Sequence, residues 1–361
     1  MFEISFFFLL LVVMVVLFRW GFVALPREGW QIMAVVPVAQ VDSRTWKGLN
    51  LTFYGLLMAV SVIASVAVFL VLMGSIGVSL STSLAMIVFL FSLCIPASSL
   101  LARVVEKRQN TFTIGGSAFL GLLVAPAVVW IVNSVVVGES PGAIPMIPGL
   151  ACMAIAYALG EGIGRLACIS FGCCYGKRIS ECHPIIQRLF GKYSFVFQGK
   201  TKKIQYEGGM EGVPVIPIQA LTCTVLVFTA LVGSGLYVKG AYVHAFLFCT
   251  IAAQAWRAIS EFLRADYRGN GKISAYQVMA VLAIVYGITL SKLLPADDYP
   301  VPVLLNGLKL LWDPASILAL ELLGLVVFLH SGRSKVTGAL LSFHLTCDPI
   351  PMISESRKEN V

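Results

Sequence analysis

Nine apolar stretches recur along this chain of 361 residues, and each is about long enough to cross a membrane as a helix. A spanning helix needs about 20 mostly apolar residues to traverse the hydrocarbon core of a bilayer. Charged residues form only 12% of the sequence, about half the share of a soluble domain. The stretches are 2–18, 51–73, 83–102, 115–136, 144–160, 217–236, 241–262, 273–291 and 303–329.

We therefore predict an all-α fold, a polytopic membrane helical bundle of about seven core transmembrane helices with one extra helix at each end and a small extramembrane head. Residues 1–50 should form an N-terminal anchor helix and a connecting loop. A membrane domain should follow at 51–291 with its head at 161–216, and then an additional transmembrane helix and polar tail at 292–361. Because Asp313-Pro314 interrupts the last stretch, its helix could instead begin near Pro314.

Basic residues are distributed unevenly between the two sides of this bundle. If the N-terminus lies outside, 22 of the 26 Lys and Arg residues fall in the loops of one side. The positive-inside rule then predicts that the head faces the cytoplasm. Long loops follow that rule poorly, so the charges of the head could also reflect its own chemistry. The loops counted are 19–50, 103–114, 161–216, 263–272 and the tail after His330.

Ionisable residues gather at the end of the seventh predicted helix, in QAWRAISEFLRADYR at 254–268. In a continuous helix Arg257, Glu261 and Arg264 share one face, because they are spaced i, i+4 and i+7. Charge at membrane depth is expensive and tends to mark functional sites. The competing interpretation is an interfacial helix end whose arginines extend toward lipid headgroups.

A third arginine, Arg165, lies in GEGIGRLACISFGCCYG at 160–176, which we expect to be a loop. An arginine fork matches a phosphate in bidentate fashion, and glycines let backbone N–H groups approach a ligand. Gly115 and Gly116, at a predicted helix N-terminus, could add backbone donors. Three arginines around Glu261 at headgroup depth therefore predict a site for a phospholipid phosphate. The glycines of the expected loop are Gly160, Gly162, Gly164, Gly172 and Gly176.

Four of the nine cysteines also lie near Arg165: Cys168, Cys173, Cys174 and Cys182, the last beside His183. Thiols can hold a soft metal ion. The spacing, however, lacks the paired Cys-x-x-Cys ligand hairpins of structural zinc sites. We therefore expect no metal and no other cofactor.

In their order along the chain these residues resemble the prolipoprotein diacylglyceryl transferase family, from about Phe53 to Ile288. The most specific similarity is RAISEFLRAD at 257–266, followed by Gln277, which is similar to the Arg-x-x-x-Glu-x-x-Arg segment of the family. GRLACISFGCCYG at 164–176 resembles its Gly-Arg-x-Gly-Asn signature. Shorter similarities are FYG at 53–55, IGG at 114–116 and IPIQ at 216–219.

The resemblance implies a multi-pass enzyme of the bacterial inner membrane that moves the diacylglyceryl group of phosphatidylglycerol onto a cysteine thiol of a lipoprotein precursor. We expect the arginines to hold the phosphate, Glu261 to orient the arginines, and Tyr54 to hydrogen-bond the ester or the nucleophile. The implied catalytic residues are Arg165, Arg257, Glu261 and Tyr54. The implied substrate-binding residues are Arg264, Gly115, Gly116, Gly164, Gly172, Gly176 and Gln219.

The chain departs from the family at the positions that would activate the acceptor. Isoleucine cannot accept a proton, so a general base is missing from its expected place. His183 could act instead, or a thiolate of Cys173 or Cys174 near the arginines. The replacements are Ile114 and Ile216 for two histidines, Cys168 for the signature asparagine, and Cys173 and Thr222 for two glutamates.

Two other functions stay open. A divergent transferase would move a lipid group to a small polar molecule or another lipid on the cytoplasmic side that the basic loops favour, whereas lipoprotein modification takes place on the outer side. A non-enzymatic lipid-binding or transport protein would keep the anion site without chemistry. A channel or secondary transporter is disfavoured, because charged residues are rare at the centres of the other helices. Nucleic-acid binding is not expected, because the net charge of +8 lies in membrane-flanking loops.

Overall fold

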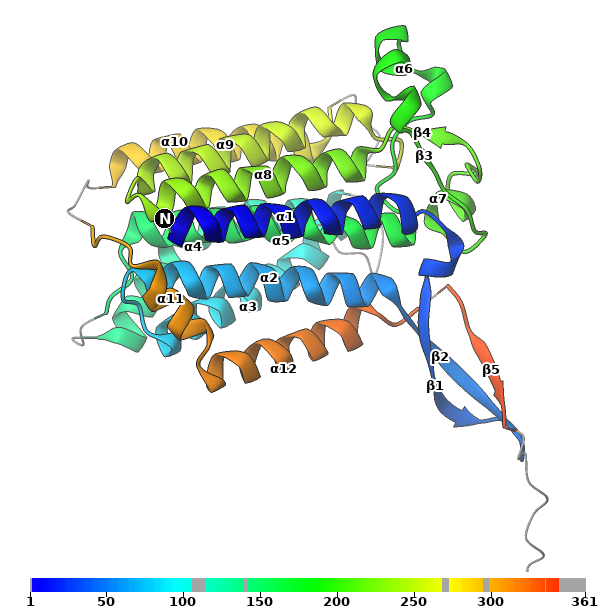
Figure 1. Ribbon diagram of the computed structural model, residues 1–361, viewed down its shortest axis with the longest axis horizontal. Coiled ribbons are helices and arrows are strands. Elements are labelled where there is room, and N and C mark those ends of the chain that lie inside the picture. The colour runs from blue at the N-terminus through cyan, green and yellow to red at the C-terminus, as the bar shows by residue number, and fades with distance from the viewer. Residues whose placement is uncertain are drawn as a thin grey trace, which may run out of the picture.

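Long helices lie side by side in most of the molecule, and their loops at one end carry a small head and a β-sheet (Figure 1). The computed structural model describes residues 2–105, 114–138, 142–267, 273–294, 299–334 and 336–343. The predicted all-α membrane bundle is confirmed, with a long helix in each of the nine expected stretches. These helices are α1 (Phe2–Ala24), α2 (Phe53–Ser75), α3 (Leu80–Val105), α4 (Ile114–Val132), α5 (Met146–Phe171), α8 (Ile218–Val238), α9 (Tyr242–Ser260), α10 (Ala275–Leu293) and α12 (Pro314–Ser331).

Among the described residues, seven helices are long and apolar enough to span a membrane. They are α2, α3, α4 with its π-helical extension η2 (Asn133–Val137), α5, α8, α10 and α12. The helix α9 packs against α5, α8 and α10 but is more polar, since it carries His244, Gln254 and Arg257. A shorter apolar helical segment, Phe8–Ala24, lies in α1. The chain is thus a multi-pass membrane protein.

The helix α5 lies in the interior of the bundle, against α2, α8 and α9. A Cβ atom added at Gly160 would stand 2.8 Å from the Cβ of Ser65 on α2, and one at Gly162 would stand 2.8 Å from Val227 on α8. Small residues let helix backbones approach closely, and such packing holds helices together where no water is present. These glycines therefore serve helix packing rather than a ligand-binding loop.

The expectation that this helix ends at residue 160 is wrong. It continues for about three more turns and ends at Gly172, whose φ of 70° is the left-handed conformation that glycine adopts readily. The i, i+4 ion pair of Glu161 with Arg165 supports the added turns. The head consequently comprises residues 172–217 instead of 161–216.

The head contains one short pair of strands and several single helical turns. The strands β3 (Phe195–Val196) and β4 (Pro214–Val215) pair antiparallel. Lys203–Tyr206 forms one helical turn, in which the amide of Glu207 donates to the carbonyl of Lys203 at 3.0 Å. The elements are η3 (Ile179–Glu181), α6 (Pro184–Phe190), η4 (Gly191–Tyr193), β3 (Phe195–Val196), α7 (Lys203–Tyr206) and β4 (Pro214–Val215).

A three-stranded antiparallel sheet occupies much of the region that we expected to be a connecting loop. After the short turn η1 (Glu28–Trp30), β1 (Ile32–Gln40) and β2 (Thr45–Thr52) form a hairpin, and β5 (Ala339–Ser342) pairs with the other edge of β2. The carboxylate of Asp42 shapes the turn by accepting from the amides of Arg44 and Thr45. The sheet therefore joins segments from the two ends of the chain.

The C-terminal addition consists of two helices, α11 (Leu304–Leu311) and α12, that pack along α2. Asp313 caps α12 by accepting from the amide of Ala315 at 2.9 Å, with Pro314 at the first helical position. The helix start expected near Pro314 is therefore confirmed.

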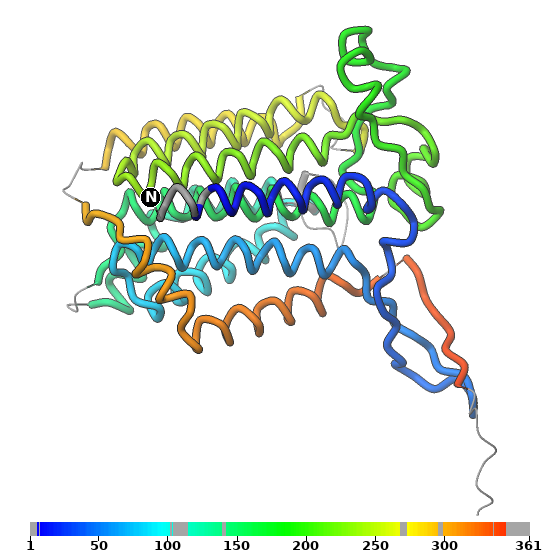
Figure 2. The backbone as a smooth tube through the Cα atoms, in the orientation of Figure 1, coloured from blue at the N-terminus to red at the C-terminus, as the bar shows by residue number. Residues whose placement is uncertain are grey.

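The head, the sheet and the C-terminal ends of α1, α5 and α9 lie at the same end of the bundle (Figure 2). This arrangement agrees with the alternation of sides assumed in counting basic residues. Most of the short basic segment 103–110 lies outside the described residues.

Lys202 joins the head to α5 and to the residue that follows α1. Its side chain is 0% exposed, and Nζ donates to the carbonyl oxygens of Leu25, at 3.1 Å, and Ser170, at 2.5 Å. Burial lowers the pKa of Lys202 to about 8, against a smaller opposing effect of Glu28. Between this value and the ordinary value of 10.5, the unfolded chain binds more protons at this residue than the folded chain, so folding becomes more favourable as the pH rises.

We predict that this residue adds on the order of 3 kcal/mol to the free energy of unfolding in detergent between about pH 8 and 10.5. Lys202→Met should remove that part of the rise, whereas Lys192→Met, at an exposed position of the head, should keep it. Denaturant unfolding of both variants at several pH values measures the difference. Identical pH profiles for the two variants would contradict the assignment.

Candidate functional site

One buried carboxylate, Glu161, joins arginines from two helices. Arg165, one turn later on α5, donates Nη2 to Glu161 Oε1, and Arg257 on α9 donates Nη2 to Glu161 Oε2 at 2.5 Å. Tyr157 completes the group, because its hydroxyl donates to Glu161 Oε2 and accepts from Arg257. The side chains of Arg165, Arg257 and Glu161 are only 11%, 12% and 4% exposed. The predicted convergence of arginines from distant segments is thus present.

The bridging glutamate is not the one that we expected. Glu261 was predicted to orient the arginines, but Glu161 occupies that position between Arg165 and Arg257. Tyr157, Glu161 and Arg165 are spaced i, i+4 and i+8 and so follow one face of α5. The sequence contains this spacing, but the three residues share a face only because α5 continues past residue 160.

Arg264 lies outside the helix, so the predicted shared helical face of Arg257, Glu261 and Arg264 is wrong. The helix α9 ends at Ser260, and η5 (Glu261–Leu263) follows it. Backbone pairing with 175–177 prevents further helix: Lys177 N donates to Leu263 O, Ala265 N donates to Tyr175 O, and Gly176 forms a β-bridge with Arg264.

The guanidinium of Arg264 is nevertheless held firmly by two acids. It donates Nε and Nη2 to Asp266 at 2.8 and 2.6 Å and lies 3.6 Å from Glu261. Such bidentate pairing fixes the plane of the guanidinium. Glu261 is therefore the partner of Arg264, and this places it beside the arginine group rather than at its centre.

Arg165 and Arg264 line the same small pocket at the head end of the bundle. Two atoms of its lining residues, Arg165 Nε and Gln219 Oε1, are buried and have no hydrogen-bond partner among the described residues. Gln219 is fixed by its other amide atom, Nε2, which donates to Cys173 O at 2.9 Å. A buried donor without a partner is costly unless a ligand supplies an acceptor. The remaining lining residues are Cys174, Ile218, Thr222 and Ser260.

Neighbouring residues closely surround several of the predicted binding glycines. Gly115, in the first turn of α4 beside the buried Gly116, leaves room for Arg257, since a Cβ there would collide with Nη1 of that residue. Gly164 faces Ser61 on α2 at ordinary contact distance. Gly176 is equally confined, because a Cβ would collide with the carbonyl oxygen of Ile216. Gly172 ends α5.

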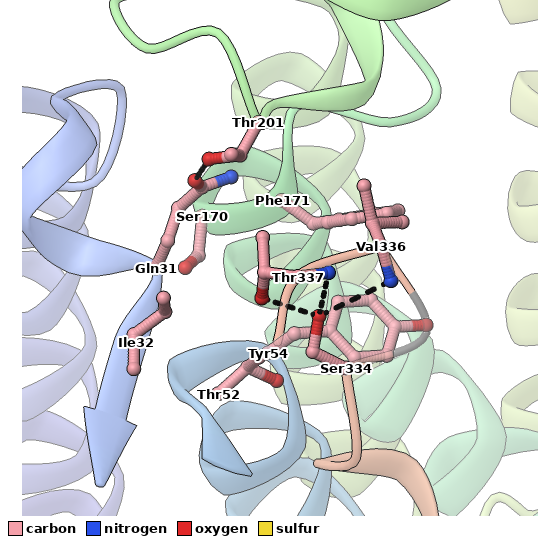
Figure 3. Close-up of a pocket in the computed structure, with 10 residues that line it drawn as sticks. All are labelled: Gln31, Ile32, Thr52, Tyr54, Ser170, Phe171, Thr201, Ser334, Val336 and Thr337. Carbon is pink, nitrogen blue, oxygen red and sulfur yellow. Dashed lines mark hydrogen bonds between the residues drawn. The ribbon is translucent and has the colours of Figure 1, made fainter. Parts of the chain in front are cut away.

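Tyr54 lies in a different pocket, at the start of α2 (Figure 3). Its ring contacts Phe171 edge to face, with centroids 5.7 Å apart. The tail residues Ser334 and Thr337 line the same pocket and hydrogen-bond each other. This pocket shares no lining residue with the arginine pocket, although Tyr54 is within electrostatic range of Arg165 and of the nearby cysteines. Its other lining residues are Gln31, Ile32, Thr52, Ser170, Thr201 and Val336.

The structure also shows the surroundings of the residues at the substituted family positions and of His183. Thr222 lines the arginine pocket and accepts a hydrogen bond from Trp256 at 3.1 Å. His183 is exposed on the head, where its Nδ1 caps α6 by accepting from Ile185 N. It does not line the arginine pocket. The Sγ atoms of Cys168, Cys173 and Cys174 lie within 4.8 Å of one another, a grouping that the spacing rules for zinc hairpins did not anticipate.

Replacing Glu161 should be far more damaging than replacing an exposed acid. Glu161→Gln leaves two buried guanidinium groups without their shared counter-charge, which should lower the free energy of unfolding by about 3–5 kcal/mol. Glu181→Gln loses a pair with Arg178 whose side chains are 63% and 40% exposed, and should change it by less than about 1 kcal/mol. Thermal unfolding in detergent measures both, and equal shifts would contradict the bridging role.

Comparison with known families agrees with this geometry. The model of the family described as prolipoprotein diacylglyceryl transferase matches residues 44–292, which include all three arginines and the whole head. A search among curated proteins finds no match. Because the matched region is well over half of the sequence, the chain belongs to the prolipoprotein diacylglyceryl transferase family.

Proposed function

We propose that this membrane protein is a transferase that moves the diacylglyceryl group of phosphatidylglycerol onto an acceptor thiol, that of a lipoprotein precursor in the family, in the bacterial inner membrane. One observation carries the proposal: two arginines line one pocket at the end of the bundle, and one of them has a buried, unpartnered Nε. A phosphate oxygen is the acceptor that such a donor lacks.

The arginines would act on the leaving phosphate. As the thiolate attacks the glycerol carbon, an S–C bond forms and the C–O bond to the phosphate breaks. Glycerol phosphate then leaves with an additional negative charge. Fixed guanidinium groups in a site with little water stabilise that charge without having to reorganise. Glu161 positions Arg165, and Asp266 positions Arg264.

The resting site is electrically balanced, which explains how so many charges can be buried together. Arg165, Arg257 and Arg264 are matched by Glu161, Glu261 and Asp266. Buried charges persist only when they are paired and hydrogen-bonded. A phosphate would therefore be bound by the uncommitted N–H groups of the arginines rather than by a large excess of positive charge.

A test of the donor site is Arg165→Lys, which keeps the charge but removes the planar fork and Nε. We expect release of glycerol phosphate from phosphatidylglycerol vesicles, with a thiol peptide as acceptor, to fall by a factor on the order of 100 or more. The matched control Arg188→Lys, at an exposed position of the head, should retain the rate. A wild-type rate in Arg165→Lys would eliminate the donor site.

The identity of the acceptor determines the side of the membrane on which the head should lie. A lipoprotein acceptor predicts the outer side, whereas a cytoplasmic acceptor fits the excess of basic residues. Several basic residues of the head are paired or buried within its own fold, among them Arg178, Lys202 and Lys203. Because contacts within the head account for these charges, the charges do not require a cytoplasmic location. We therefore favour the outer side of the membrane for the head.

Thiol labelling from outside decides between these acceptors. Lys192→Cys places a thiol on the head, and Lys239→Cys places one at the opposite end of the bundle. With a membrane-impermeant maleimide on right-side-out vesicles, we expect labelling above the wild-type level for Lys192→Cys alone. Labelling of Lys239→Cys alone would instead favour the divergent transferase with a cytoplasmic acceptor.

The divergent transferase is favoured by one observation, the replacement of the expected histidines by Ile114 and Ile216. Lipid extracts from cells with and without the protein, compared with the lipidation of lipoprotein precursors, separate the candidates. Loss of a lipid species with intact lipoproteins would select another acceptor. No change in either would select a lipid-binding protein without catalysis.

A further inference from the structure

Three cysteines converge where α5 meets the head. Cys168 is on the last turn of α5, and Cys173 and Cys174 follow the capping residue Gly172. The amide of Cys173 donates to the carbonyl of Cys168 at 3.1 Å, which folds the chain back over the helix end. Cys174 has φ 55°, a left-handed conformation that is unfavourable for a residue with a side chain. The backbone thus adopts an uncommon conformation at one of the three thiols.

The geometry of the three thiols suits a soft metal ion. Their Sγ atoms all lie within 4.8 Å of one another. Zinc–thiolate bonds of about 2.3 Å in a tetrahedral site place ligand sulfurs about 3.8 Å apart, so shifts of about 1 Å or less would complete the site. Thiolates select soft ions such as Zn²⁺ over Mg²⁺ or Ca²⁺.

The surroundings leave one side of this group accessible from the arginine pocket. Cys168 and Cys173 are buried, at 5% and 9% exposure, whereas Cys174 lines the pocket together with Arg165 and Arg264. Three thiolates and a divalent ion carry a net charge of −1, and adjacent guanidinium groups favour that charge. Three protein ligands with one open position are typical of catalytic rather than structural zinc.

We propose that Cys168, Cys173 and Cys174 bind a divalent soft metal ion, Zn²⁺ in its simplest form, whose fourth position opens toward the arginine pocket and takes the thiol of the acceptor. This role rests on the proposed function. On binding, the acceptor thiol releases its proton to solvent, because a metal-coordinated thiol is deprotonated. Its sulfur then forms the S–C bond while the C–O bond to the phosphate breaks. The metal replaces the general base that Ile114 cannot provide.

Metal binding is tested on the full-length protein purified in detergent without chelators. We expect about one Zn²⁺ per chain by elemental analysis, and sulfur-to-cadmium charge-transfer absorption when Cd²⁺ is added. Cys174→Ser should weaken Zn²⁺ binding by at least about tenfold, whereas Cys182→Ser, on the head outside the group, should leave it unchanged. Absence of bound Zn²⁺ and of the cadmium band in the wild-type protein would overturn the proposal, with no variant required to fold.

Activity measurements separate this inference from the proposed function. Removing the metal should lower transfer to a thiol peptide at least tenfold while phosphatidylglycerol binding stays intact, and added Zn²⁺ should restore the rate. Full transfer by metal-free protein would refute the acceptor role and leave the transferase standing. Stoichiometric Zn²⁺ without transfer under any condition would contradict the proposed function and support the metal site.

Discussion

A single carboxylate buried inside the bundle determines how this site is built. Glu161 shares its two oxygens between guanidinium groups of α5 and α9, so neither arginine can move without exposing an uncompensated charge. Three glycines provide the space that this buried ion pair requires. Gly115 leaves space for the guanidinium of Arg257, while Gly160 and Gly162 let α5, which carries Glu161, pack closely against α2 and α8. Close packing of the helices and pairing of the buried charges therefore depend on each other, and the phosphate site that we propose depends on both.

Segments outside the residues that the family model matches lie at the same end of the molecule as the arginine pocket. The N-terminal strand β1 and the C-terminal strand β5 both pair with β2, and the tail after α12 lines the pocket of Tyr54. The helices α11 and α12 pack along α2, which contains that tyrosine in its first turn. The N-terminal and C-terminal segments outside the matched region thus meet at the sheet beside the membrane domain.

Much of the architecture was predictable from local sequence, because apolar length alone identifies helices that must satisfy their backbone in a membrane. The convergence of Arg165 with Arg257 was also predictable. The central role of Glu161 was not, because GEGIG reads as a flexible loop until the packing of α5 between α2 and α8 is known. Arg264 lies outside the expected helix because its backbone pairs with Gly176, which is distant in sequence. The sheet was missed for the same reason, since β2 and β5 are separated by almost the whole chain.

The central claim is that Arg165 binds the phosphate while Arg257 on α9, joined to it through Glu161, holds it in position. A double-mutant cycle with Arg165→Lys and Arg257→Lys, measured as the affinity of the purified chain for phosphatidylglycerol, tests it most directly. Residues in one hydrogen-bonded network show coupling energies of about 0.5–3 kcal/mol. We predict a coupling of at least about 1 kcal/mol, with the second substitution adding little to the first. Additive losses would show that the two guanidinium groups act independently and would contradict the claim.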